Sequence, residues 1–168
     1  MPRDYGDPAC AIAQALRVMG DGWCLLIIRE AFLGTRRFAG FEAQLAISKN
    51  ILASRLQHLV DEGVLDKVDV GQFGVRFEYQ LTRKGKDLLT VISALRQWGD
   101  RWIFGEGQEP LVVVDRETGE PVLPIRIRRA DGTVVPSRDL ELRPGPGVSL
   151  EGRDLGAAAP SDSDDKSS

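Results

Sequence analysis

SKNILASRLQHLVDEGVL, residues 48–65, is the stretch of sequence that decides the fold. Ser48 is a favourable N-cap for a helix, and Gly63 can end one. The leucines recur at the spacing of one helical face, which predicts the side that packs on the core: Leu52, Leu56 and Leu59. The opposite side carries polar or small residues: Ser48, Lys49, Asn50, Ala53, Ser54 and Gln57. The stretch therefore predicts an amphipathic helix with a buried leucine face and an outward polar face.

Three helical segments are expected before this helix. The spacing of apolar residues predicts them over 8–20, 23–33 and 38–45, separated by breaks that contain glycine. Only three residues separate the third segment from the helix that follows Ser48. A helix, a short break and a second helix are typical of a helix-turn-helix motif.

Two strands and a long helix are expected after it. Residues 64–70 and 76–81 alternate apolar and polar side chains around a turn at 71–74. Thr82 is an N-cap candidate for a fifth helix that runs to about Phe104 and carries more apolar surface than a lone small domain needs. The predicted fold class is mainly α with small β: a winged helix-turn-helix domain over 8–105.

The pattern of residue types changes at Pro110. Short β-prone runs at 111–114, 122–127 and 140–142 alternate with Gly and Pro turns, which predicts a small β-rich appendage over 110–147. Residues 148–168 are rich in Gly, Ala, Ser and Asp and hold little apolar surface, so we expect them to be a disordered tail.

Charge is distributed unevenly along the chain. The formal net charge is −3, but residues 34–86 hold nine Lys and Arg against six Asp and Glu. A local basic surface matters more for phosphate binding than the total charge does. The predicted helix-turn-helix segment is therefore compatible with binding to nucleic acid.

Several other classes of function are excluded. The sequence has no Gly-rich phosphate loop, no Gly-x-Ser-x-Gly and no His-Glu-x-x-His motif, and His58 is its only histidine. Cys10 and Cys24 are too few and too far apart for a disulfide framework or a Cys-x-x-Cys metal site. We therefore expect a protein that is not an enzyme, with reduced thiols, no cofactor and no metal.

The sequence also carries no membrane or secretion signal. The longest apolar run, 23–28, is six residues long, whereas roughly 20 are needed to cross a bilayer. The N-terminal residues lack the apolar core of a secretory signal. We expect a cytoplasmic protein with no membrane partner.

The order of motifs resembles the HxlR-type transcriptional regulators over roughly Cys10 to Trp102. The stretches that carry the resemblance are CAIAQAL (10–16), Gly22-Trp23, Arg37-Phe38, SKNILASRLQHLVDEGVL (48–65) and EYQLTRKGKDLL (78–89). The resemblance implies a repressor or activator that binds double-stranded operator DNA. It also implies a homodimer, built largely from the first and last helices, that presents two recognition helices to a pseudo-palindromic site. A winged-helix module for protein interaction, without DNA binding, is the alternative.

Candidate DNA contacts follow from the outward face of the recognition helix and from the wing. Asn50, Ser54 and Gln57 are expected to read bases, whereas Lys49 and Arg55 are expected to neutralise phosphates. Arg76, beside the wing turn, is placed to touch a phosphate or the minor groove. The full predicted set is Arg36, Arg37, Ser48, Lys49, Asn50, Ser54, Arg55, Gln57 and Arg76. For Arg37, a plain surface charge at a helix start is an equal alternative.

Two kinds of signal are candidates for control. Cys10 matches an N-terminal cysteine that several family members use as a redox or electrophile sensor, although an inert small residue at a helix start is the alternative. A small aromatic effector is the competing signal. Four aromatic residues could line its apolar pocket, although residues of this kind are more often simple core: Trp23, Trp98, Trp102 and Phe104. Cys24 lies inside an apolar run and is expected to be a poorly reactive core residue.

In some relatives the matching extension looks like a small zinc ribbon. Here the ligand positions are occupied by Asp115, Thr118, Arg128 and Asp131, and Gly145-Pro-Gly147 follows. Threonine and arginine cannot ligate zinc, and this half of the chain has neither Cys nor His. We expect a metal-free β-hairpin module that supports a dimer, contacts a partner or only covers the domain.

Overall fold

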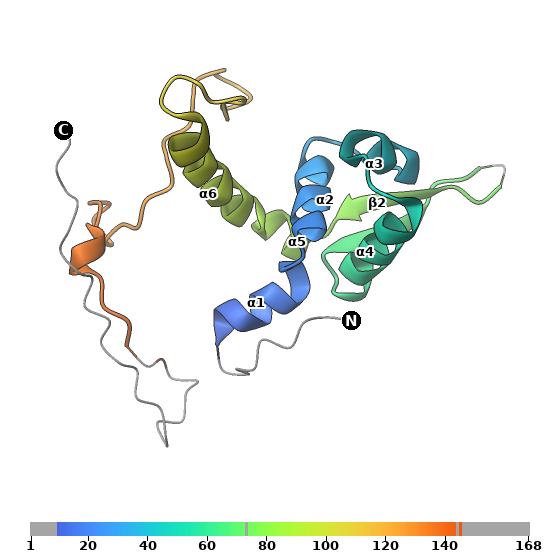
Figure 1. Ribbon diagram of the computed structural model, residues 1–168, viewed down its shortest axis with the longest axis horizontal. Helices are drawn as coiled ribbons and strands as arrows, with labels where there is room; N and C mark the ends of the chain where they lie inside the picture. Colours follow the sequence, from blue (N-terminus) through green and yellow to red (C-terminus); the bar gives the residue numbers. More distant parts are fainter. Residues whose placement is uncertain (1–9, 73, 144, 146–168) are drawn as a thin grey trace. The chain divides into compact units, whose positions relative to one another are not determined.

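The structure is a computed structural model that describes residues 10–72, 74–143 and 145 (Figure 1). They fall into two structural units, which divide between Ile125 and Arg126. The predicted tail, the last residues of Gly145-Pro-Gly147 and the beginning of the first predicted helix lie outside the described residues. The first unit contains all the described α-helices and the sheet.

The first unit is mainly helical. Its elements are α1 (Ala11–Met19), α2 (Gly22–Phe32), α3 (Phe38–Leu45), α4 (Lys49–Asp61), β1 (Leu65–Asp69), β2 (Phe77–Leu81), α5 (Arg83–Asp87), α6 (Leu89–Gly99) and a π-helical turn, η1 (Asp100–Phe104). The two strands are antiparallel, with Leu65 opposite Leu81 and Asp69 opposite Phe77. This order confirms the mainly α fold with a small sheet, in which β1 and β2 form the wing.

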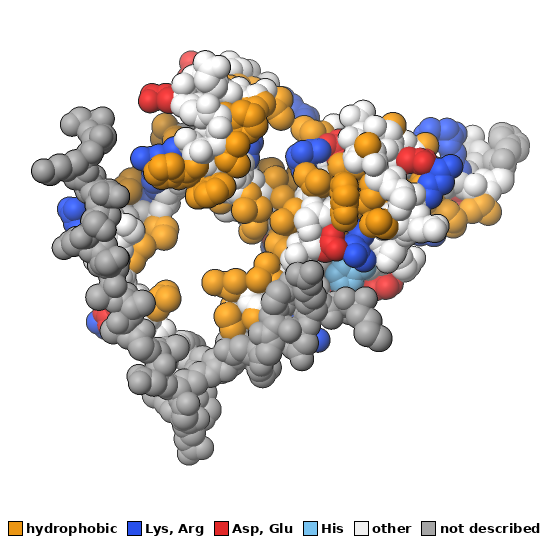
Figure 2. Space-filling model, in the orientation of Figure 1, with side chains coloured by type: hydrophobic (Ala, Val, Ile, Leu, Met, Phe, Trp, Pro, Cys, Tyr) orange, Lys and Arg blue, Asp and Glu red, His pale blue; other side chains and the backbone are white. Residues whose placement is uncertain are grey.

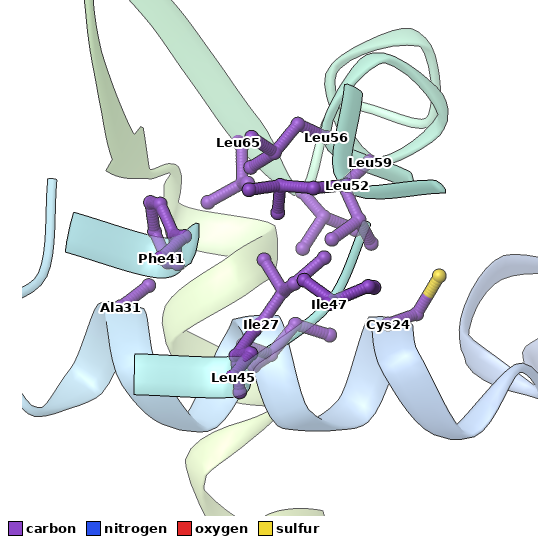
Figure 3. Packing of buried hydrophobic residues seen from close by; sticks show 12 residues of the cluster. Cys24, Ile27, Ala31, Phe41, Leu45, Ile47, Leu52, Leu56, Leu59 and Leu65 are labelled. Carbon is purple, nitrogen blue, oxygen red and sulfur yellow. The ribbon is translucent and has the colours of Figure 1, made fainter. Parts of the chain in front are cut away.

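One hydrophobic core holds α2, α3 and α4 together. Leu52, Leu56 and Leu59 of α4 are fully buried, as are Ile27 of α2 and Phe41 of α3. Figure 3 shows side chains of these three helices pointing into one shared cluster. Because burial of a leucine side chain contributes about 1.5–3 kcal/mol, the three leucines fix which side of α4 faces the core. The leucine face predicted from the sequence is confirmed.

Side-chain caps and one left-handed residue set the helix boundaries. Asp21 caps α2 by accepting a hydrogen bond from the Trp23 N–H at 2.9 Å, and Thr82 caps α5 by accepting from the Gly85 N–H at 3.0 Å. Ala46, which follows α3, has φ 48° and is the only non-glycine residue with a positive φ in the described part of the chain. That torsion turns the chain from α3 into α4.

The predicted fifth helix is divided into three elements, which corrects the expectation of one helix from Thr82 to about Phe104. The chain turns at Leu88, between α5 and α6. Gly85 places α5 so close to the sheet that an added Cβ would lie 2.2 Å from the Val64 carbonyl oxygen. At the far end the Gly105 N–H donates to the Asp100 carbonyl, five residues back, at 2.8 Å. This wider turn ends the helix at Gly105, whose φ is 94°.

The described region after Pro110 has antiparallel bridges in place of regular strands. The described residues beyond 110 contain no strand, only isolated bridges at Val114–Pro121 and Arg128–Val134 and a 3-10 turn, η2 (Ser137–Asp139). Residues 111–125 belong to the first unit because side chains of α6 hold their backbone. Gln97 bonds both backbone groups of Ile125, at 2.8 and 3.2 Å, and Arg96 donates to the Leu111 carbonyl at 3.0 Å.

Among the described helices, none alone combines the length and the apolarity required to cross a membrane. Only α1 and α2 taken together are long and apolar enough, and the two helices are bent by 74° where they join.

Candidate nucleic-acid interface

The N-terminal half of α4 forms an exposed polar surface. Ser48 caps the helix by accepting a hydrogen bond from the Ile51 N–H at 3.5 Å. All the residues predicted to face outward are exposed: Ser48, Lys49, Asn50, Ala53, Ser54 and Gln57. The helix therefore separates a buried leucine side from an accessible polar side, as the sequence predicts.

The three predicted base-reading residues differ in the hydrogen bonds that their side chains already make. The Asn50 side chain makes no hydrogen bond within the described part of the protein. The Ser54 hydroxyl accepts only a long bond from Arg55 Nη1, at 3.5 Å. Gln57 donates to the Asp61 carboxylate at 2.7 Å. Asn50 is therefore the best placed of the three to bond a base edge without giving up an existing contact.

Arg55 has a structural contact that the sequence does not predict. Its Nε and Nη2 atoms lie 2.9 and 2.8 Å from Asp21 Oδ2. Because Asp21 also caps α2, this carboxylate joins the N-terminus of α2 to the middle of α4. A phosphate would have to compete with Asp21 for Arg55. Lys49, by contrast, lies 3.7 Å from Glu42 Oε1 in an exposed pair, and such pairs contribute little.

His58 fixes α4 against the first helix. Its Nε2 atom lies 3.0 Å from the Val18 carbonyl oxygen at the end of α1. Because a carbonyl can only accept, Nε2 carries the proton in this contact. The side chain is half-buried and links α1 to the recognition helix.

The wing turn is held by one carboxylate. Asp69 Oδ1 accepts hydrogen bonds from the Gly71 N–H at 2.9 Å and the Arg76 N–H at 3.0 Å. The bonds from Arg76 and Gly71 lower the pKa of Asp69, so the carboxylate stays ionised. A Cβ at Gly71 would lie 1.7 Å from the Gly74 carbonyl oxygen, so no larger residue fits there. The Arg76 side chain is exposed beside this turn.

Arg36 and Arg37 lie beside the wing. The Tyr79 N–H of β2 donates to the Arg36 carbonyl at 2.7 Å, so the segment before α3 runs along the free edge of β2. Arg37 Nε lies 3.1 Å from Glu78 Oε1. Both arginines are exposed. The structure thus brings them next to the strand that follows Arg76, a contact between distant residues that leaves no local pattern in the sequence.

The two cysteines have different environments. Cys10 is half-buried and caps α1, where its sulfur accepts a long hydrogen bond from the Ala13 N–H at 3.5 Å. Cys24 is 1% exposed. Burial, together with the nearby Asp21 charge, raises the pKa of the Cys24 thiol to about 11, against a smaller opposing effect of Arg55. The prediction that Cys24 is a core residue is confirmed.

The four aromatic residues proposed for a ligand pocket do not share one environment. Trp23 packs against the core. Trp98, Trp102 and Phe104 are 60%, 66% and 53% exposed on α6 and η1. Figure 2 shows hydrophobic side chains gathered on the surface over α6 and α1. Within one chain Trp98, Trp102 and Phe104 are therefore exposed apolar side chains, whereas Trp23 is not.

Asp115, Arg128 and Asp131, whose positions are compared above with those of zinc ligands, close turns. Asp115 Oδ1 accepts from the Thr118 N–H at 2.8 Å and from the Thr118 hydroxyl at 3.1 Å. Asp131 Oδ1 accepts from the Thr133 N–H at 2.9 Å, and Arg128 donates to the Gly132 carbonyl at 2.7 Å. No three metal-ligating side chains cluster in the described ranges. These side chains therefore stabilise the local backbone.

Three helices packed under a capped recognition helix, followed by a two-stranded wing, define a winged helix-turn-helix DNA-binding domain. The family model described as HxlR-like helix-turn-helix matches residues 18–106. The chain belongs to this HxlR family of transcriptional regulators.

Relatives and solved structures agree with this family. The chain is 37% identical to Rv3095 of Mycobacterium tuberculosis, an uncharacterized HTH-type transcriptional regulator, over 82% of this chain and 87% of the relative. It is similar to the crystal structure of PA1607, a candidate transcription factor, with a TM-score of 0.75 and 39% identity over 82% of this chain and 96% of that one. A more distant match is the redox regulator HypR in its oxidized form, with a TM-score of 0.51 and 25% identity over 54% and 95% of the two chains.

Proposed function

We propose that this regulator is a homodimer that binds a pseudo-palindromic operator through α4 and the wing. The observation that carries the proposal is the exposed polar face of α4, where Asn50 and Ser54 are accessible while the leucines behind them are buried. A helix of this kind can place its first turns against base edges in the major groove. The exposed Arg36, Arg37 and Arg76 lie beside or on the wing and can neutralise phosphates.

An exposed apolar surface supports the dimer. Ile12 of α1 is 72% exposed, and Leu95, Trp98 and Trp102 of α6 and η1 are also exposed. Large exposed apolar patches are typical of surfaces that a partner covers. A two-fold dimer through these helices would present two copies of α4 to DNA, which explains the expectation of a pseudo-palindromic site.

The DNA-binding proposal is tested by fluorescence anisotropy on the intergenic DNA upstream of the gene for this chain, at stated salt concentrations. Arg76→Ala should weaken binding to specific and random duplexes alike and reduce the salt slope by about 1. Asn50→Ala should cost about 1–3 kcal/mol on the specific duplex and change the sequence preference. Equal losses for both variants on both duplexes would contradict the assignment. No binding to any duplex would favour the protein-interaction module instead.

Thiol oxidation or an electrophile is the signal that we propose for control. Support comes from the place of Cys10, half-buried at the start of α1, and from the resemblance to a redox regulator. Oxidation at Cys10 could bridge two subunits and shift their recognition helices. Band shifts should show that diamide changes operator affinity for the wild type and leaves Cys10→Ser unaffected. The same response in both proteins would exclude Cys10 as the sensor.

A small aromatic effector is the alternative signal. The exposed Trp98, Trp102 and Phe104 support it, because a dimer seam through α6 would place two copies of these rings near one another. A thermal-shift screen with phenolic, quinone and flavonoid compounds should then raise the Tm for at least one of them. A flat response would count against control by such a ligand.

A further inference from the structure

Ile51 is an exposed aliphatic side chain in the first turn of α4. It is 41% exposed, whereas Leu52, Leu56 and Leu59 on the same helix are fully buried. The hydrophobic core therefore does not hold Ile51. Its neighbours on the helix surface, three and four residues further on, are Ser54 and Arg55, and Arg55 is paired with Asp21. An apolar contact of this kind is how proteins detect the C5-methyl group of thymine in the major groove.

Of the two cations in the first turns of α4, Arg55 is poorly placed for reading guanine. Guanine is most often read by an Arg or Lys that donates to its O6 and N7 atoms. Arg55 is half-buried and donates through two nitrogen atoms to Asp21. Lys49, the first residue of the helix, makes only a weak exposed pair with Glu42 of α3, so it competes with Asn50 as a base-reading group and the choice between them is left to the test below. Besides the Ser54 hydroxyl, the exposed side chains of the first two turns that have no charged partner are thus the Asn50 amide and the apolar Ile51 and Ala53.

From this arrangement we infer that the first two turns of α4 read A·T base pairs in each half-site. Asn50 can donate to adenine N7 and accept from the adenine N6 amino group, which are complementary bonds. Ile51 packs on the methyl group of a thymine. This inference rests on the proposed function and specifies the DNA that the same face recognises.

The test uses duplexes selected from a random-sequence library with the wild-type chain. We expect A·T pairs at symmetric positions of the enriched sequences. Thymines of each half-site are then replaced, one at a time, by deoxyuridine, which keeps base pairing and lacks the methyl group. Since one buried methyl group contributes about 0.8 kcal/mol, one replacement should lower wild-type affinity about fourfold.

Two variants show whether Ile51 makes that contact. Ile51→Ala should lose a similar factor on the thymine duplex and be insensitive to the deoxyuridine replacement that affects the wild type. Asn50→Ala should stay sensitive to it. Leu123→Ala is the matched control, because Leu123 is a strongly exposed aliphatic residue outside α4, and it should behave as the wild type.

The outcomes separate the two proposals. Selected half-sites with G·C pairs at the specified positions, or wild-type binding that no deoxyuridine replacement changes, would overturn the reading of A·T pairs and leave sequence-specific DNA binding intact. If no sequence is enriched and the upstream DNA is not bound, the proposed function itself fails.

Discussion

At the scale of single residues, Asp21 serves two helices at once. It caps α2 and pairs with Arg55 of α4. Partial burial opposes its ionisation, but the hydrogen bonds from Arg55 and from the Trp23 N–H outweigh burial, so the pKa of Asp21 lies below its ordinary value of 3.8. A pKa that is lower in the folded state means that the ionised carboxylate stabilises the fold.

Asp21→Asn therefore tests a pH-dependent stabilisation. Asparagine still caps α2 but loses the ion pair, so we expect a loss of about 0.5–1 kcal/mol at neutral pH, reduced by the partial exposure of the pair. The difference from the wild type should persist above pH 3.8 and shrink as the pH falls through the lower folded-state pKa. Urea unfolding followed by circular dichroism measures it. Glu106→Gln is an exposed control, and a difference that does not shrink in acid would exclude the ion pair as its source.

The Cys24 thiol should be unreactive toward thiol reagents in the folded protein. With a pKa of about 11, only about one thiol in a thousand is ionised at pH 8, and the thiolate is the reactive form. In the folded Cys10→Ser variant we expect no reaction with a disulfide reagent over minutes, and full reaction after unfolding in urea. Rapid reaction of the folded variant would show that Cys24 is accessible.

At the scale of elements, the contact between α5 and the sheet depends on one glycine. The Thr82 hydroxyl donates to the Gly63 carbonyl at 2.7 Å, and Gly85 lies against the Val64 carbonyl. These contacts place α5 directly against the base of the wing. They also determine where α6 can begin.

Gly85→Ala should therefore destabilise the fold. Its Cβ would lie 2.2 Å from the Val64 carbonyl oxygen, so α5 would have to shift, at a cost of about 1–3 kcal/mol. Gly22→Ala is the matched control, because nothing lies within 4 Å of a Cβ there, and helix propensity favours alanine by up to about 1 kcal/mol. Thermal unfolding of the two variants should change the Tm in opposite directions. An unchanged Tm for Gly85→Ala would mean that α5 can move away from the Val64 carbonyl without loss of stability.

The sequence predicts the elements whose signals are local. The leucine spacing in α4 and the caps at Ser48 and Thr82 are patterns within a few residues. The break at Leu88, the pairing of Arg36 with Tyr79 and the Asp21–Arg55 pair arise from contacts between residues far apart in the chain. The sequence also does not reveal the exposure of Ile51, because whether an isoleucine beside the buried Leu52 is covered depends on how the helix packs.

At the scale of the whole molecule, the exposed surface of α1, α6 and η1 predicts the oligomeric state. Light scattering should give twice the chain mass of 18.5 kDa. Trp98→Asp would place a charge in the proposed seam, and we expect it to weaken dimerisation at least tenfold, because a buried unpaired charge costs several kcal/mol. Leu123→Asp is the control at an exposed site. A monomeric wild type would contradict the proposed dimer.

The left-handed torsion of Ala46 restricts which sequences can form this motif. Its φ of 48° is a conformation that glycine adopts freely, that alanine adopts at some cost, and that β-branched residues almost never adopt. Ala46 is exposed, so a valine there would meet open space and still be disfavoured. The sequence variation that evolution can accept at this surface position is therefore set by backbone torsion alone.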